Sequence, residues 1–453
     1  MSENNFSRRK FLTGAAAIGA AGAMGVGTLS SCTSSGGGAD TGIFSWTKRE
    51  YKYPPMLDTV PEGKVLTAGI IGCGGRGSGA AINFLDAGGA TVTVTALGDV
   101  FQDRVDDLVK KLAEHESKTE IAPEKCFVGF DAFEKVIDSG VDIVILATPP
   151  KFRPEHFEAA VKARKHVFME KPVAVDPVGI RQVLAAAKMA DSLGLKVVTG
   201  TQRRHEHSYI NLFKELNDNN AIGKITTAEV YWNGGKLWHR DNNPSWSEME
   251  WMIRDWVNWC WLSGDHIVEQ HVHNIDVANW FIGKSPVKAL GFGSRQRRVT
   301  GDQYDNFAVD YVYDDGMHIT STCRQINGCS NGVYEIFHGT KAIATTESHQ
   351  PRIVDAAGNA LFTAQGSEVS PYVQEHKNLI TCIRQNIPFN EAENTANSVM
   401  VAIMGRVSAY TGKEVTFEEM MNSDMKLGPE TYVMGNIGYM QTAKIPVPGT
   451  LEG

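Results

Sequence analysis

The sequence predicts a doubly wound α/β domain followed by an α+β domain with a large, mostly antiparallel open sheet. Short apolar strands alternate with helical segments up to about residue 200, and strand-like runs dominate after that point. Apolar residues make up 42% of the 453 residues, which is enough for two packed domains. The formal net charge of -8 argues against nucleic-acid binding, because a phosphate backbone requires a basic surface.

The first domain is predicted to span residues 64–195. Residues 65–71 form a short apolar run that ends in glycines, as in a buried strand. Strands and helices then alternate, so the strands are expected to lie parallel in one sheet. Further strands are predicted at residues 91–97, 141–147 and 166–169, and helices at residues 78–87, 104–116 and 155–163.

The second domain is predicted to span residues 196–445. It contains several long β-rich runs and few helical segments, which favours a largely antiparallel sheet. Strands are predicted at residues 226–232, 289–294, 306–312, 318–325 and 333–338, and helices at residues 265–282, 372–385 and 394–411.

Residues 1–31 resemble an export signal. The run Ser7-Arg8-Arg9-Lys10-Phe11-Leu12 precedes a short apolar stretch, as in twin-arginine (Tat) signals, and Leu29-Ser30-Ser31-Cys32 resembles a lipobox. We therefore expect Tat export and a periplasmic protein that contacts the membrane only through a lipid on Cys32. Residues 32–63 would form a tether and lead-in. The alternative is a plain signal peptide in which the cysteine is incidental.

A glycine-rich turn follows the first predicted strand. It reads Gly72-Cys73-Gly74-Gly75-Arg76-Gly77 and matches the G-x-G-x-x-G pattern of a Rossmann domain. Glycines allow the tight turn and let backbone N–H groups approach a pyrophosphate at the helix N-terminus. Asp99 ends the next strand, where a carboxylate can accept hydrogen bonds from ribose hydroxyls. The pattern predicts an NAD cofactor, with NADP possible because Arg104 is close in sequence.

Two further motifs carry a family resemblance. Ala147-Thr148-Pro149-Pro150 follows one predicted strand, and Lys165-His166-Val167-Phe168-Met169-Glu170-Lys171-Pro172 contains the next. With the glycine turn, this order resembles the glucose–fructose oxidoreductase and inositol dehydrogenase (Gfo/Idh/MocA) family. The resemblance implies cofactor contacts from Thr148, Pro149, Glu170 and Lys171, with Lys171 between nicotinamide and substrate. It also implies a homodimer or homotetramer.

The segment from Gly264 to Asp276 supplies the remaining catalytic candidates. Glu269, His273 and Asp276 are spaced i, i+4, i+7, which predicts one face of a helix. The family usually has D-x-x-x-H-x-x-D here, with the histidine as base, so the resemblance assigns that role to His273. Glu269 replaces the usual aspartate and is expected to orient the histidine. Although other histidines are near, the spacing does not favour a metal, and none is expected.

Substrate contacts are predicted with less support from motifs. Eight of the nine tryptophans lie between Trp232 and Trp280, and aromatic faces suit sugar C–H surfaces. Arg203, Trp238 and His239 are the candidates for substrate binding. Core or subunit packing is the alternative for the tryptophan, and pairing across the domains is the alternative for Arg203.

These observations favour an NAD(P)-dependent oxidoreductase that oxidises a secondary hydroxyl of a small-molecule sugar, glycoside or polyol. Outside the cytoplasm no free dinucleotide pool exists, so a tightly bound cofactor is expected. Two alternatives remain: a redox glycosidase that uses NAD for oxidation, elimination, hydration and reduction, and a sugar-binding lipoprotein without activity.

Overall fold

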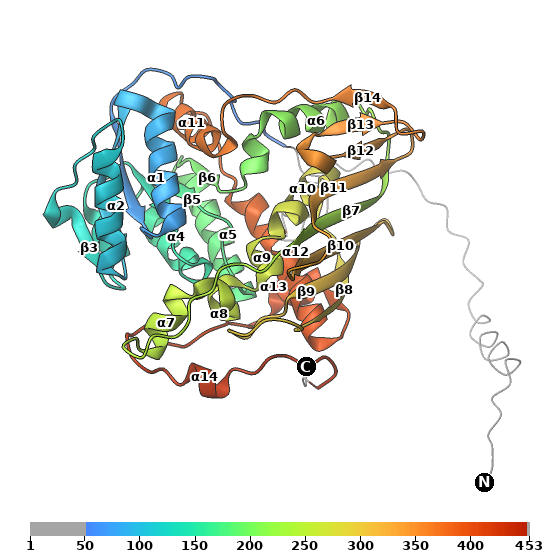
Figure 1. Ribbon diagram of the computed structural model, residues 1–453. Coiled ribbons are helices and arrows are strands. Elements are labelled where there is room, and N and C mark those ends of the chain that lie inside the picture. Colours follow the sequence, from blue (N-terminus) through green and yellow to red (C-terminus); the bar gives the residue numbers. More distant parts are fainter. Residues whose placement is uncertain (1–50, 451–453) are drawn as a thin grey trace, which may run out of the picture. The chain divides into compact units, whose positions relative to one another are not determined.

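The computed structural model describes residues 51–450, and two β-sheets organise this part of the chain (Figure 1). The predicted export signal, including Cys32, lies outside the described residues. Within residues 51–450, no helix is both long and apolar enough to cross a lipid bilayer.

The first sheet has six parallel strands in the order β3-β2-β1-β4-β5-β6. This order is that of a doubly wound dinucleotide-binding fold, so the predicted fold class is confirmed. The last strand lies beyond the predicted boundary at residue 195, because its backbone pairs with β5. The strands are β1 (Leu66–Ile71), β2 (Val92–Asp99), β3 (Cys126–Val128), β4 (Ile143–Leu146), β5 (His166–Met169) and β6 (Val197–Thr199).

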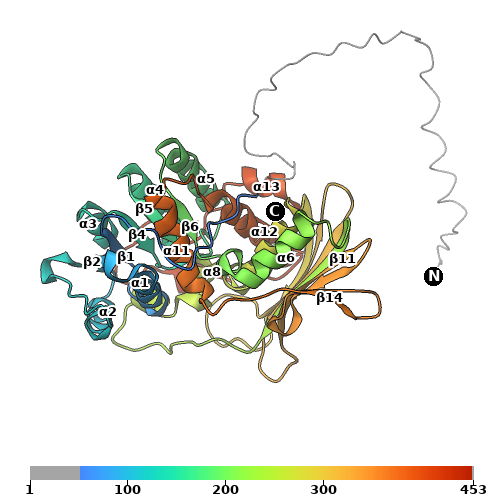
Figure 2. The same ribbon diagram turned by 90° about the horizontal axis from the view of Figure 1, so that it is seen from above.

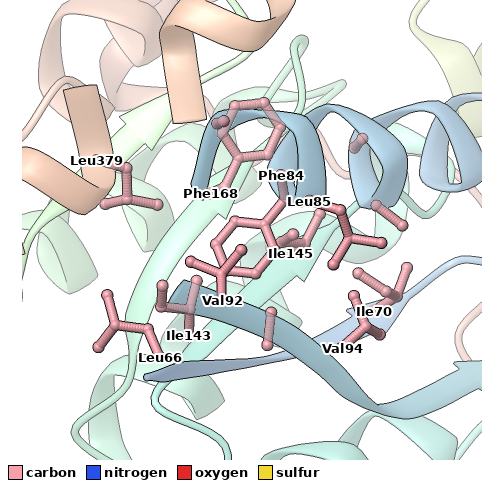
Figure 3. Close-up of a cluster of buried hydrophobic side chains, with 14 of the residues drawn as sticks. Leu66, Ile70, Phe84, Leu85, Val92, Val94, Ile143, Ile145, Phe168 and Leu379 are labelled. Atoms are coloured by element: carbon pink, nitrogen blue, oxygen red, sulfur yellow. The ribbon is translucent and has the colours of Figure 1, made fainter. Parts of the chain in front are cut away.

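Helices cover both faces of this sheet, and one of them comes from the C-terminal part of the chain. Figure 3 shows Phe84 of α1 and Leu379 of α11 beside the strand residues Ile143 and Phe168, all completely buried. Each such side chain contributes about 1.5–3 kcal/mol to folding. A helix predicted within the second domain therefore completes the core of the first. The helices are α1 (Gly75–Gly88), α2 (Gln102–Glu114), α3 (Ala132–Asp138), α4 (Arg153–Lys162), α5 (Pro177–Ser192) and α11 (Pro371–Arg384).

Within residues 51–450 the second sheet has nine strands, of which only β7 and β10 pair in parallel. The predicted mostly antiparallel open sheet is therefore confirmed. Buried and more exposed residues alternate along β9 and β10, as expected for a sheet with one covered face. The strands are β7 (Ile225–Gly234), β8 (Lys288–Ser294), β9 (Asn306–Val312), β10 (His318–Gln325), β11 (Gly332–Gly339), β12 (Ile343–Thr345), β13 (Arg352–Val354), β14 (Ala360–Thr363) and β15 (Val415–Thr416).

One face of the second sheet is covered by helices α6 (His207–Asn217), α10 (Val272–Ile282) and α12 (Ala392–Thr411), and Figure 2 shows α6 and α12 on that side. The close approach of α12 requires small residues. A Cβ on Gly291 of β8 would lie 2.8 Å from the carbonyl oxygen of Gly405 on α12. Buried Arg406 of α12 donates hydrogen bonds at 2.9 Å to the carbonyls of both Val175 and Gly264, and thereby links the two domains.

The helix predicted at residues 265–282 is interrupted. The chain forms α9 (His266–Glu269) and then α10, separated by Gln270 and His271. Two tertiary hydrogen bonds hold this break: His271 Nε2 lies 2.7 Å from the Ser321 hydroxyl, and the Gln270 side chain accepts from Gln325 at 2.8 Å. Both partners lie on β10, which the spacing of the apolar residues could not reveal.

Candidate functional site

The glycine-rich turn connects β1 to α1, as predicted. Gly72 has a positive φ of 93°, and a Cβ there would lie 2.6 Å from the backbone of Ala147. A Cβ on Gly77 would lie 1.7 Å from the Gly72 carbonyl oxygen. These two positions need glycine for the turn itself. By contrast, a Cβ on Gly74 or Gly75 would meet no atom within 4 Å, so these two glycines border open space at the N-terminus of α1.

That open space is part of a cavity of about 310 Å³ at the carboxyl ends of the parallel strands. Its position at the helix N-terminus suits a pyrophosphate, because backbone N–H groups and the helix dipole favour an anion. The predicted cofactor residues that line it are Gly72, Gly74, Gly75, Asp99, Thr148 and Pro149.

Asp99 ends β2 at the mouth of this cavity. Its carboxylate accepts hydrogen bonds from the Cys73 N–H at 2.7 Å and from the Phe101 N–H at 3.0 Å. Burial raises the pKa of Asp99, although these two backbone donors oppose the shift. A carboxylate held at this point is placed to accept hydrogen bonds from the ribose of a bound dinucleotide. Arg104, the residue for which NADP was considered possible, lines the same cavity.

Arg76 and Glu170 pair with each other. The Arg76 guanidinium contacts the buried Glu170 carboxylate through Nε and lies 3.7 Å from the Glu375 carboxylate. Burial and the neighbouring Glu170 raise the pKa of Glu375 well above its usual range, while Arg76 opposes the shift. Glu170, predicted as a cofactor residue, thus fixes the arginine of the glycine turn. Tyr372 of α11 lies against the same guanidinium, with its ring centroid 4.8 Å away.

Lys171 follows β5 and reaches the second domain. Its ammonium donates to the Glu269 carbonyl oxygen at 2.5 Å and to the Glu269 carboxylate at 3.1 Å. The break between α9 and α10 makes the first contact possible, because in a continuous helix that carbonyl would accept from the N–H of residue 273. Instead, the His273 N–H donates to the Gln270 carbonyl at 3.2 Å.

His273 lies in the first turn of α10 and is buried beside the Trp232 ring, with 5.6 Å between ring centroids. Burial lowers the pKa of His273 well below its usual range, and the nearby charges of Lys171, Arg203 and Arg76 lower it further. The imidazole is therefore neutral at neutral pH and able to accept a proton. The expected orientation by Glu269 is not what the structure gives, since Glu269 binds Lys171.

Asp276, the other acidic residue of the predicted helical face, also has a partner other than His273. Asp276 forms a buried two-point ion pair with Arg204, at 2.7 and 2.9 Å. Arg203 is buried near His273: its guanidinium lies 5.6 Å from the Trp232 ring centroid and 3.5 Å from the Glu335 carboxylate. Arg204 therefore pairs with a residue of the second domain. Arg203 lies near the Trp232 ring, which also contacts the candidate base His273.

The structure separates Trp238 and His239 from Lys171 and His273. Trp238 lines the cavity beside Asp99, and His239 lies 3.4 Å from the exposed carboxylate of Asp241. Within residues 51–450, no three histidine, cysteine, aspartate or glutamate side chains are grouped as a metal site. The expectation that no metal takes part stays a prediction.

Several cavity residues were not predicted as cofactor contacts, and one of them, Trp238, was predicted to bind substrate. They come from segments far from the glycine turn in sequence and share no local motif with it. Those from outside the first domain are Trp238, Arg240, Ile253, Arg254, Trp256 and Tyr432.

Comparison with protein families matches both domains. Residues 66–198 match the model for the oxidoreductase family with an NAD-binding Rossmann fold (Gfo/Idh/MocA), and residues 210–345 match the model for a Gfo/Idh/MocA C-terminal domain. The first match contains the glycine turn, Asp99, Glu170 and Lys171, and the second contains Glu269 and His273.

Individual relatives are distant. The chain is 26% identical over 199 residues to myo-inositol 2-dehydrogenase of Thermotoga maritima, an alignment of 44% of this chain and 50% of the relative. It is 23% identical over 237 residues to inositol 2-dehydrogenase of Rhizobium meliloti, which covers 51% and 64% respectively. The chain thus spans about half to two thirds of the length of these relatives.

Among solved structures, the aldose-aldose oxidoreductase of Caulobacter crescentus has a similar fold. The TM-score is 0.62 at 18% identity, and the match covers 78% of this chain and 100% of the other.

Proposed function

Because the chain belongs to the Gfo/Idh/MocA family of NAD-binding oxidoreductases, we propose that it oxidises a secondary hydroxyl of a sugar, glycoside or polyol with a tightly bound NAD(P). The observation that carries this proposal is the meeting of Lys171, from the end of β5, with the break beside His273 in the second domain. A hydrogen-bond donor and a neutral base thereby lie at the carboxyl edge of the dinucleotide-binding sheet. The naming of two distant relatives as inositol dehydrogenases supports a polyol or sugar substrate.

In the proposed reaction, His273, Lys171 and Glu269 each have a separate role. When bound, the oxidised nicotinamide supplies the hydride acceptor at C4. A ring nitrogen of His273 takes the hydroxyl proton as the carbon loses hydride, which leaves a ketone and a protonated histidine. The Lys171 ammonium donates a hydrogen bond to the hydroxyl oxygen and stabilises its developing negative charge. Glu269 holds the ammonium, so it is a positioning residue.

The residues of the cavity fit a dinucleotide in two respects. The open side of Gly74 and Gly75 leaves room for a pyrophosphate, and Asp99 is held by backbone donors where a ribose would lie. Asp99 favours NAD over NADP, because its carboxylate would repel a 2′-phosphate.

The deciding experiment begins with the purified mature protein, which is denatured so that released dinucleotide can be identified. Native protein is then mixed with glucose, glucosides and inositols while absorbance near 340 nm is followed. Stoichiometric reduction of the bound dinucleotide by one compound supports the dehydrogenase. Reduction followed by re-oxidation with loss of the aglycone from a glucoside favours the redox glycosidase. Protein that binds no dinucleotide, and reduces neither NAD nor NADP when these are supplied, contradicts the proposal.

For location and assembly, we propose Tat export, a lipid anchor on Cys32 and a homodimer or homotetramer. The first two rest on the twin arginines and the lipobox. The third rests on the second sheet, whose uncovered face bears Leu290 and Phe292, with 38% and 68% of their surfaces exposed. Metabolic labelling with palmitate in wild type and Cys32→Ala tests the anchor, and light scattering of the mature protein tests the assembly.

A further inference from the structure

The dinucleotide cavity has a second wall that does not belong to the first domain. The glycine turn, Asp99 and the loop with Thr148 form one side. Residues 238–256, here called the roof segment, and Tyr432 of the C-terminal segment supply the rest of the lining. The roof segment contributes Trp238, Arg240, Ile253, Arg254 and Trp256. In Figure 1 the helix α7 (Glu248–Arg254) of the roof segment and the C-terminal segment with α14 (Tyr439–Thr442) lie on the same side of the first domain.

The roof segment and the C-terminal segment are bound to each other. The Glu248 carboxylate accepts hydrogen bonds of 2.7 Å from the N–H groups of Ile437, Gly438 and Met440. The Met249 N–H also donates to the Gly435 carbonyl at 3.0 Å. The two segments therefore form one unit, and displacement of either one breaks these contacts.

This unit is attached to the first domain at two places. Arg254 forms two 3.0 Å hydrogen bonds with the Asp103 carboxylate on α2, and its guanidinium lies 3.9 Å from the Phe101 ring centroid. On the other side of the cavity, the Tyr432 ring packs edge-on against Phe152, with 5.0 Å between centroids, and near Phe130.

The Arg254 attachment lies at the adenosine half of the cavity, whereas Tyr432 reaches the ends of two strands, because Phe130 follows β3 and Phe152 follows β4. Asp103 and Phe101 follow β2, whose end carries the ribose-binding candidate Asp99. Phe130 follows β3, the next strand outward in the sheet. In a doubly wound sheet the adenosine lies over the ends of β2 and β3. Trp238 and Arg240 line the cavity between the attachments, with the guanidinium 5.5 Å from the indole centroid.

We propose that the roof segment and Tyr432 complete the dinucleotide site and keep the dinucleotide bound through many turnovers. This inference rests on the proposed function, because it concerns the same cofactor. Release of the dinucleotide requires the unit to move away from Phe152 and Asp103. Dinucleotide that is reduced by oxidation of a hydroxyl substrate is therefore reoxidised in place by a second, carbonyl-containing substrate, which takes up the hydride and a proton. Such recycling would suit the proposed export.

The two attachments are expected to contribute unequally to retention of the dinucleotide. The Asp103 side chain is 54% exposed, and exposed ion pairs change an equilibrium by about fivefold at most. Tyr432 packs in an aromatic cluster with Phe152 and Trp261, and loss of such a ring removes a large apolar contact. Tyr432 is therefore the residue to change.

The test measures dinucleotide exchange in the full mature protein. Wild type, Tyr432→Ala, Trp238→Ala and the control Tyr432→Phe are incubated with isotopically labelled NAD, and bound dinucleotide is analysed by mass spectrometry after denaturation. We expect Tyr432→Ala and Trp238→Ala each to exchange at least about tenfold faster than wild type, the effect of losing roughly one buried aromatic contact. Tyr432→Phe, which keeps the ring, should exchange like wild type.

Unfolding curves of each variant show whether faster exchange comes from a less stable fold. Trp238 is 46% exposed, so its loss should leave stability unchanged. Exchange in wild type that is as fast as in both alanine variants overturns the inference but leaves the dehydrogenase intact. Slow exchange in wild type, together with a bound dinucleotide that no sugar or polyol reduces, supports the inference but contradicts the dehydrogenase.

Discussion

The Lys171 ammonium binds Glu269 twice, at the backbone carbonyl oxygen and at the carboxylate. The carbonyl is available because the helix is interrupted directly after Glu269, so a backbone acceptor that a helix normally uses internally serves a side chain of the other domain. This contact places the charge of Lys171 near His273 and helps to lower the pKa of the histidine.

Replacement of Glu269 by Gln should slow reduction of the bound dinucleotide. The charge-assisted hydrogen bond is lost, and such bonds contribute about 1.5–3 kcal/mol, or roughly 10- to 150-fold in rate. Stopped-flow absorbance measures the effect. Glu269→Asp keeps the charge and should recover part of the rate, with a change in kcat rather than in KM. Equal losses in both variants would argue against the charge as the cause.

Replacement of His273 by Asn should lower the rate of hydride transfer by about 10²- to 10⁴-fold, because the base that accepts the hydroxyl proton is removed. The dinucleotide content of the purified protein should not change, since His273 does not line the dinucleotide cavity. Single-turnover reduction and the released dinucleotide are measured on the same samples. A variant that retains the wild-type rate would exclude His273 as the base.

Two glycine substitutions should separate folding from cofactor binding. In Gly77→Ala the new Cβ would collide with the Gly72 carbonyl, and such overpacking costs about 1–3 kcal/mol of stability. In Gly74→Ala the Cβ enters open space, so stability should stay near wild type while dinucleotide binding is lost. Urea unfolding and dinucleotide content distinguish the two. Full dinucleotide content in Gly74→Ala would mean that the pyrophosphate lies elsewhere.

Arg204→Met should destabilise the fold without a specific effect on chemistry. Removal of one partner leaves Asp276 buried without its counter-charge, which costs about 3–5 kcal/mol. Lys64→Met is the matched control, because the Lys64 side chain is 73% exposed in its pair with Asp142, and its loss should cost about 1 kcal/mol or less. Chemical denaturation measures both. A loss of stability for Arg204→Met as small as that for Lys64→Met would mean that Asp276 is hydrated or protonated in the Arg204→Met variant.

Stability should fall as the pH is lowered through the usual histidine range. Burial lowers the pKa of His156 and of His271 to about 3, whereas an unfolded histidine titrates near 6.5. The unfolded state therefore binds more protons below pH 6.5, and stability present above that pH is lost as the pH falls. Each histidine should cost about 2 kcal/mol at pH 5.

Urea unfolding at pH 7 and pH 5 tests this dependence. His271→Asn removes one contributor and should give a smaller difference between the two pH values. The same pH difference in wild type and in His271→Asn would mean that His271 is not neutral and buried in solution.

The sequence by itself determined the alternation of strands and helices in the first domain, the glycine turn and the antiparallel character of the second sheet, although β3, α3 and α5 were not predicted. These follow from local signals: apolar periodicity marks the strands, and the glycines stand where only a residue without a side chain fits. Lys171 and His273 were identified from motifs that resemble those of the Gfo/Idh/MocA family.

Only the tertiary structure decided what these residues contact. The spacing of Glu269, His273 and Asp276 predicted one helical face, but contacts with β10 interrupt the helix and each residue acquires a different partner. Likewise, the wall that Tyr432 adds to the cavity comes from a segment far from the glycine turn in sequence. Local periodicity cannot encode such contacts, because they depend on where distant backbone segments meet after the two domains have packed.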